Sequence, residues 1–204
     1  TGESSTNIYV SGDAHDITFR ACQSRRSARQ GFFSERTTRN VVVEGCSFSD
    51  NGGRGPDNLD HNLYVEGTGH RIVNNVIVGA KNGYGIQLYP ATTNVVVANN
   101  TIVGNRSGII VGAEETAATT GVVIVNNIVA NNERTGISSY WANAPGSGNI
   151  ARSNLLFRNG QGDLDKSGGG LIFHANTIAN PKFVDVTKRD FRLQPGSAAE
   201  GRAA

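Results

Sequence analysis

The stretch Ile72-Val73-Asn74-Asn75-Val76-Ile77-Val78-Gly79 recurs along the chain and decides the fold. Close copies begin at Val97 and Val123, and weaker ones begin at Phe19, Val43, Ala151 and Phe173. The residues that we align with Asn75 are Cys22, Cys46, Asn75, Asn100, Asn126, Asn154 and Asn176, at spacings of 24, 29, 25, 26, 28 and 22 residues. A unit near 26 residues therefore repeats about seven times, which is typical of solenoid proteins.

Each unit holds two or three strand-sized apolar pieces, such as Gly85-Ile86-Gln87-Leu88 and Val95-Val96-Val97. Composition agrees, because the 204 residues include 33 Val and Ile but only 8 Leu and no Met, and β-branched residues favour strands. No unit contains a helical period long enough for a βαβ crossover. We therefore expect an all-β parallel solenoid in one domain, residues 1–204, with coils over about 8–185 and a C-terminal cap or tail over 186–204.

Stacked coils lie about 4.8 Å apart, so equivalent residues form columns. The aligned positions predict one interior column of Asn side chains, which supply both donors and acceptors to buried turns. A second column is expected through Asn51, Asn105, Asn131 and Asn159. Cys22 and Cys46 extend the first column either as buried free thiols or as a disulfide, and both alternatives fit a column spacing of about 4.8 Å.

With this interior Asn ladder, the repeats resemble the right-handed, single-stranded parallel β-helix proteins of the pectin-lyase-like superfamily, over residues 8–185. The ending Asn180-Pro181-Lys182-Phe183-Val184-Asp185, with Asp190-Phe191-Arg192-Leu193 after it, resembles the last turn and cap of bacterial secreted members. The resemblance implies a right-handed β-helix and an extracellular or periplasmic location. It implies little about activity, since the superfamily includes lyases, hydrolases, epimerases and non-catalytic proteins.

Polar and aromatic residues converge on one outer face. Aligning the Gly-apolar strands predicts an outward column of Phe33, Tyr64, Gln87, Ile110 and Ser138, and a neighbouring column of Glu35, Glu66, Tyr89, Gly112 and Tyr140. The densest stretch runs from Asp57 to Glu66. If Leu63 and Val65 point inward, Asn62, Tyr64 and Glu66 point outward.

This face suggests chemistry on an acidic polysaccharide. β-Elimination needs a base, an acid and a cation that neutralises the uronate carboxylate. His61 and Tyr64 are the candidate base and acid, in either order, and Arg36, Arg71 or Lys81 is the candidate cation. The predicted substrate-binding residues are Asn62, Glu66, Tyr84, Gln87, Tyr89, Tyr140, Trp141, Arg36, Arg71 and Lys81. His61 capping a turn and Tyr64 as an ordinary strand aromatic are the structural alternatives.

No cofactor is required by these residues. Ca²⁺ is one option, because Asp57, Asp60 and Glu66 carry oxygen ligands of the type it binds. The catalytic signatures of the related families are missing: Asp60-His61 lacks the proline of the epimerases' Asp-Pro-His. Three functions therefore stay open, a lyase that cleaves uronate polymers, a non-catalytic carbohydrate-binding or surface-structural module, and a uronate C5-epimerase. We expect a monomer, with no nucleic-acid or membrane partner.

Overall fold

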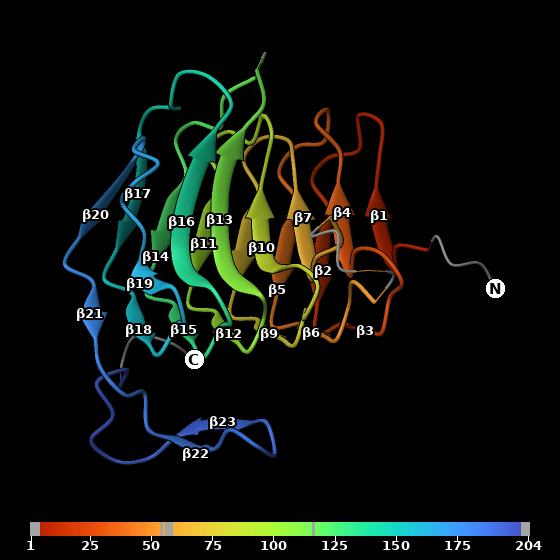
Figure 1. Ribbon diagram of the computed structural model, residues 1–204. Coiled ribbons are helices and arrows are strands. Elements are labelled where there is room, and N and C mark those ends of the chain that lie inside the picture. The colour runs from red at the N-terminus through yellow and green to blue at the C-terminus, as the bar shows by residue number, and fades with distance from the viewer. Residues whose placement is uncertain (1–4, 54, 56–58, 116, 201–204) are drawn as a thin grey trace.

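The computed structural model describes residues 5–53, 55, 59–115 and 117–200. Three parallel sheets of seven strands each wind around one core, and Figure 1 shows the coils following one another from the N-terminus. The all-β parallel solenoid predicted from the repeat is confirmed. Within the described part of the chain, no helix is long and apolar enough to cross a membrane.

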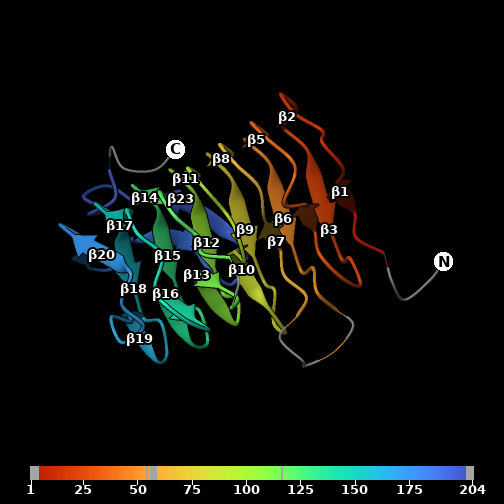
Figure 2. The same ribbon diagram turned by 90° about the horizontal axis from the view of Figure 1, so that it is seen from above.

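The strands of the first sheet are β1 (Ile8–Val10), β4 (Phe32–Ser34), β7 (Leu63–Val65), β10 (Tyr84–Leu88), β13 (Ser107–Ala113), β16 (Thr135–Trp141) and β19 (Gly162–Leu164). Those of the second are β2 (Thr18–Arg20), β5 (Val42–Glu44), β8 (Arg71–Val73), β11 (Val96–Ala98), β14 (Val123–Val125), β17 (Asn149–Arg152) and β20 (Leu171–His174). Those of the third are β3 (Gln23–Arg25), β6 (Ser47–Ser49), β9 (Val76–Val78), β12 (Thr101–Val103), β15 (Ile128–Ala130), β18 (Leu155–Phe157) and β21 (Thr177–Ile178). Viewed from above, each coil lies beside the next in register (Figure 2).

The interior Asn ladder is present. Asn75 donates its side-chain amide to Asn100 Oδ1 at 2.9 Å, and Asn100 in turn donates to Asn127 Oδ1 at 2.9 Å. Each Asn also donates to a backbone carbonyl and accepts a backbone N–H from the coil before it. The ladder continues through Asn154 to Asn176. Side chains thus satisfy turn amides that have no strand partner.

The prediction of Asn126 as a ladder residue is wrong, because Asn127 occupies that place. In each Asn-Asn pair the first residue takes the left-handed turn conformation, as Asn74, Asn99 and Asn126 do with φ of 57°, 56° and 56°. The second residue then enters the core. The same one-residue shift applies to the second column, which uses Asn132 in place of Asn131.

The two cysteines occupy the ladder at its N-terminal end. Cys46 Sγ accepts the backbone N–H of Cys22 at 3.3 Å, the place that an Asn Oδ1 takes in later coils. Cys46 N–H donates to Asn75 Oδ1 at 2.8 Å, so the column is continuous from thiol to amide. Both thiols are free in this structure.

The C-terminal segment packs beside the solenoid. The coils end at β21, earlier than the predicted boundary at 185, and β22 (Phe183–Asp185) pairs with β23 (Asp190–Leu193) as an antiparallel hairpin below the third sheet (Figure 1). Phe183, Phe191 and Leu193 pack against residues of that sheet, among them Val103 and Ile128. The hairpin reaches back to an early coil, where Arg189 forms two hydrogen bonds with Asp50 at 2.6 and 2.8 Å.

We predict that Asn100→Ala lowers the free energy of unfolding by roughly 1–3 kcal/mol, because buried groups of two neighbouring coils lose their partners. Urea unfolding monitored by circular dichroism measures the loss. Asn126→Gly is the matched control, since glycine tolerates the left-handed turn and should change stability by less than about 0.5 kcal/mol. Equal losses in the two variants would contradict the assignment of the ladder.

Candidate functional site

A groove of about 850 Å³ lies on the outer face of the first sheet. All five tyrosines of the chain line it, together with His61 and Gln87: Tyr9, Tyr64, Tyr84, Tyr89 and Tyr140. Part of this set forms one column across neighbouring strands, in which Phe33 lies opposite both Tyr9 and Tyr64, and Tyr64 lies opposite Gln87. The predicted outward column from Phe33 to Ser138 follows this register.

The rings of the column stack on one another. Tyr9 and Phe33 have ring centroids 5.1 Å apart with planes at 9°, and Phe33 and Tyr64 have centroids 4.9 Å apart. Because neighbouring rings occupy the faces, the column presents ring edges and hydroxyl groups outward. The groove thus offers a row of hydrogen-bonding phenols on an apolar support, a surface suited to amphipathic ligands.

Tyr140 reaches across one coil because the strand beside it carries Gly112. A Cβ built on Gly112 would lie 2.9 Å from Tyr140 Cζ, so the ring occupies the space that a side chain would fill. From there the Tyr140 hydroxyl meets the Gln87 amide at 2.8 Å, and its ring lies 5.6 Å from that of Tyr89. A glycine thus brings residues of three coils into contact.

His61 is 1% exposed and lies at the mouth of β7. Its Nδ1 accepts the backbone N–H of Tyr84 at 2.9 Å, and its ring stacks on the Tyr84 ring with centroids 4.7 Å apart. Burial lowers the pKa of His61 from 6.5 to about 3, against a smaller opposing effect of Gln87. The neutral ring has its Nδ1 lone pair occupied, so its proton is on Nε2 and no lone pair is free to act as a base.

Asn62 is a scaffold residue, and the expectation that it points outward is wrong. Its side chain accepts from Asn51 at 2.9 Å and donates to Asn105 at 2.9 Å, and it is 0% exposed. The second column needs this insertion because the intervening coil has Ala80 at the ladder position. The Asn62 side chain supplies the ladder amide that Ala80 lacks. Because Asn62 is fixed in the core, its neighbour His61 is held at the edge of the core.

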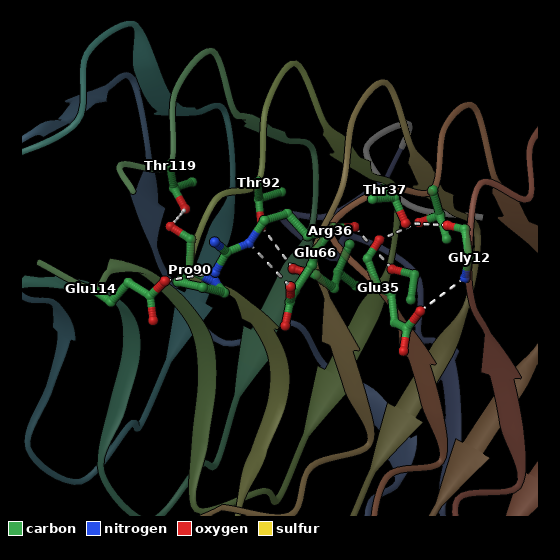
Figure 3. A network of polar contacts seen from close by, with 12 residues as sticks. Gly12, Glu35, Arg36, Thr37, Glu66, Pro90, Thr92, Glu114 and Thr119 are labelled. Atoms are coloured by element: carbon green, nitrogen blue, oxygen red, sulfur yellow. Dashed lines mark hydrogen bonds and ion pairs between the residues drawn. The ribbon is translucent and has the colours of Figure 1, made fainter. Parts of the chain in front are cut away.

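Carboxylates gather at the carboxyl ends of the first sheet's strands. Figure 3 shows Arg36 between Glu66 and Glu114, at 3.8 and 2.6 Å. Glu35 accepts the backbone N–H of Gly12 at 2.8 Å, and the charge of Glu66 acts on the nearby Tyr64 phenol, adding to the effect of burial that raises its pKa. Burial raises the pKa of Glu66, opposed by Arg36, and burial also raises the pKa of Tyr64, so this phenol stays protonated at neutral pH. Arg36 is thus already paired with acids.

Three of the predicted binding residues lie away from the groove. Arg71 belongs to β8 of the second sheet. Lys81 follows β9, where its charge acts on Asp50. The Trp141 indole N–H donates to Gly169 O at 3.0 Å, and its ring packs under Gly170 and on the core. The placement of these three in one site with Tyr64 is therefore wrong, because they face other surfaces.

The proposed Ca²⁺ ligands do not meet. Asp57 lies outside the described residues. Asp60 precedes β7 and is fully buried beside Arg29, 3.6 Å away, whereas Glu66 follows the same strand. An extended strand rises about 3.3 Å per residue, so carboxylates at its two ends cannot share one ion. The described residues contain no group of three or more His, Cys, Asp or Glu placed to hold a metal.

Sequence reasoning missed five residues of the groove, Thr6, Tyr9, Arg29, Gln30 and Leu59. Gln30 Nε2 donates to Leu59 O at 2.9 Å and its Oε1 accepts the N–H of His61 at 2.6 Å. A signal was available for Tyr9, because extending the column one coil back from Phe33 arrives at it. Arg29 and Gln30 lie in a loop whose path no repeat predicts.

A scan against protein families matches residues 1–141 to the family described as periplasmic copper-binding protein (NosD). This chain belongs to the NosD family. The chain is also similar in structure to the periplasmic alginate epimerase AlgG, with a TM-score of 0.70 and 16% identity over 86% of this chain and 43% of that one. A point mutant of AlgG gives a TM-score of 0.58 and 15% identity, over 84% and 46% of the two chains.

The NosD-family chain thus spans less than half the length of these epimerase structures. At such identity the likeness shows the fold alone, the parallel β-solenoid that the repeat predicted. No curated protein matches the sequence significantly. The description of the family as periplasmic indicates a periplasmic or extracellular location.

The described residues of this NosD-family member do not fit a copper centre. Copper favours imidazole and sulfur ligands, and the chain has four His, two Cys and no Met. Cys46 is buried with its sulfur in the ladder. The ring nitrogens of His61 and His70 are engaged by backbone and side-chain groups. His15 and His174 lie exposed in different parts of the chain.

We predict that acid weakens the fold through His61. The unfolded chain protonates this histidine near pH 6.5, but the folded chain does so only near pH 3. Between these values the unfolded state binds more protons than the folded state. The free energy of unfolding therefore decreases as the pH is lowered, by up to about 1.4 kcal/mol per pH unit. Burial also lowers the pKa of His70 and adds to the trend.

Urea unfolding at several pH values between 7 and 4 measures this slope. His61→Asn should flatten it, whereas His174→Asn, which removes an exposed imidazole, should leave it unchanged. An identical slope in wild type and His61→Asn would show that His61 does not titrate as the buried geometry requires.

Proposed function

We propose that this protein binds a polysaccharide in the tyrosine-lined groove, with the polymer crossing successive coils. The observation that carries the proposal is the gathering of all five tyrosines on one open face. Sugars present both apolar C–H faces and hydroxyl groups, and tyrosine matches both with its ring and its phenol. The aromatic column Tyr9, Phe33 and Tyr64 repeats at the coil spacing, which suits a ligand that is itself repetitive.

An acidic, uronate-containing polymer is the proposed ligand class. Arg29 lines the groove at the end opposite to the glutamates. Its Nε lies 3.6 Å from the buried Asp60, and its side chain is 44% exposed, which leaves part of the guanidinium accessible to a carboxylate of the ligand. Arg36 is paired with two carboxylates, those of Glu66 and Glu114. The similarity of the fold to a periplasmic alginate epimerase supports the same ligand class.

Catalysis on that polymer, by a lyase or a C5-epimerase, is the second candidate. The Tyr64–Glu66 pair supports it, because a protonated phenol beside a carboxylate can supply an acid. His61 serves as the base in the predicted scheme only if Nδ1 releases the Tyr84 N–H. Unsaturated uronate absorbance tests for a lyase, and proton NMR of the polymer tests for an epimerase, since configuration then changes without chain cleavage.

We predict that Tyr89→Ala weakens binding to alginate or pectate roughly tenfold, because an aromatic contact contributes about 0.5–1.5 kcal/mol beyond the area it buries. Isothermal titration calorimetry measures the affinity. Arg29→Ala should weaken binding to acidic polymers but not to neutral ones. Arg71→Ala is the matched control, because Arg71 lies on the second sheet. Absence of binding by the folded wild-type protein to any polymer would refute the proposal.

A further inference from the structure

A chain of hydrogen-bonding groups spans several coils at the groove, and the first group in it determines which group donates and which accepts at each contact. It begins at the backbone N–H of Tyr84, which donates to His61 Nδ1 at 2.9 Å. A backbone N–H can only donate, so Nδ1 must accept and the single proton of the neutral ring must be on Nε2. The peptide group of Tyr84 therefore determines the tautomer of the histidine.

The direction is transmitted by Gln87. The side chains of His61 and Gln87 both line the groove, and Gln87 raises the pKa of His61 against the effect of burial, as a hydrogen-bond acceptor beside the ring does. The Gln87 amide nitrogen donates to Tyr140 Oη at 2.8 Å. Because His61 Nε2 carries the proton, the amide oxygen of Gln87 must face the histidine. The amide nitrogen then faces Tyr140 and donates to its hydroxyl oxygen, which is the orientation that the structure records.

The Tyr140 hydroxyl is left with a proton to donate. Its oxygen accepts from Gln87, and its other described contact is with the ring of Tyr89. The ring is held over Gly112 on the groove side of the sheet, so the hydroxyl cannot retreat into the core. A phenol oxygen that accepts a hydrogen bond from the protein can still donate its own proton to a ligand.

We propose that Tyr140 is a fixed hydrogen-bond donor in the groove, oriented by the Tyr84 peptide through His61 and Gln87, and that it recognises an acceptor oxygen of the bound sugar. This inference rests on the proposed polysaccharide function. It gives His61 a positioning role, which agrees with its burial and with the absence of a free lone pair. It also gives a role to Gln87, which follows the aromatic rings of Phe33 and Tyr64 in the outward column.

Calorimetric measurement of the binding of defined alginate oligosaccharides tests whether Tyr140 acts as a hydrogen-bond donor. Tyr140→Phe should weaken binding about five- to tenfold. Gln87→Glu should weaken it similarly, because a carboxylate accepts from both His61 and Tyr140 and turns the phenol proton away from the ligand. In the Tyr140→Phe background, Gln87→Glu should cause little further loss. Additive losses would indicate charge repulsion and overturn the proposal, as would unchanged binding by Tyr140→Phe.

Nitrogen-15 NMR of the histidine rings tests the first step without a ligand. His61 should show a protonated Nε2 and an unprotonated Nδ1 throughout pH 5 to 8. A proton on Nδ1 would overturn the inference whether or not any polymer binds. If the tautomer is as assigned but the wild-type protein binds no polysaccharide, the proposed function fails, and the ligand role of Tyr140 fails with it.

Discussion

Each coil of this protein buries backbone amides that only the neighbouring coil can satisfy. Asn100 illustrates the constraint: it bonds to groups of the coil before it and of the coil after it, and it is fully buried. An unpaired buried amide costs about 1–3 kcal/mol, so slipping a coil by one residue would be penalised at every turn. The ladder therefore holds the coils in register, and register aligns the side chains of the outer face.

The groove depends on this scaffold at one specific point. The coil that carries Ala80 lacks its ladder side chain, and Asn62 enters from the start of β7 to replace it. Because Asn62 turns inward, the adjacent His61 is held at the core edge, against Tyr84 and Gln87. The missing ladder amide at Ala80 is thus the point where the scaffold and the candidate site meet, because Asn62 belongs to the ladder and its neighbour His61 lines the groove.

The repeat made the solenoid, the strand positions and the Asn column predictable, because its period is visible in the sequence. Where two Asn residues are adjacent, the sequence does not show which of them belongs to the ladder, so the predicted ladder position is accurate only to within one residue. The backbone shows that Asn126 takes the left-handed turn conformation and that Asn127 enters the core. The outward column from Phe33 to Ser138 was predictable from strand alternation. The burial of Asn62 was not, since it depends on the missing amide at Ala80. The docking of the hairpin beside the third sheet was also beyond the repeat, because it depends on contacts with distant coils such as the one containing Asp50.

The central claim, that the tyrosine face is the ligand-binding face, can be tested most directly by fluorine NMR of protein made with fluorotyrosine. Since all five tyrosines line the groove, every fluorine signal reports on it. Titration with an acidic oligosaccharide is expected to shift several tyrosine signals in a saturable manner, with the same affinity as calorimetry. Binding detected by calorimetry with all five signals unchanged would contradict the account, because the ligand would then occupy another surface.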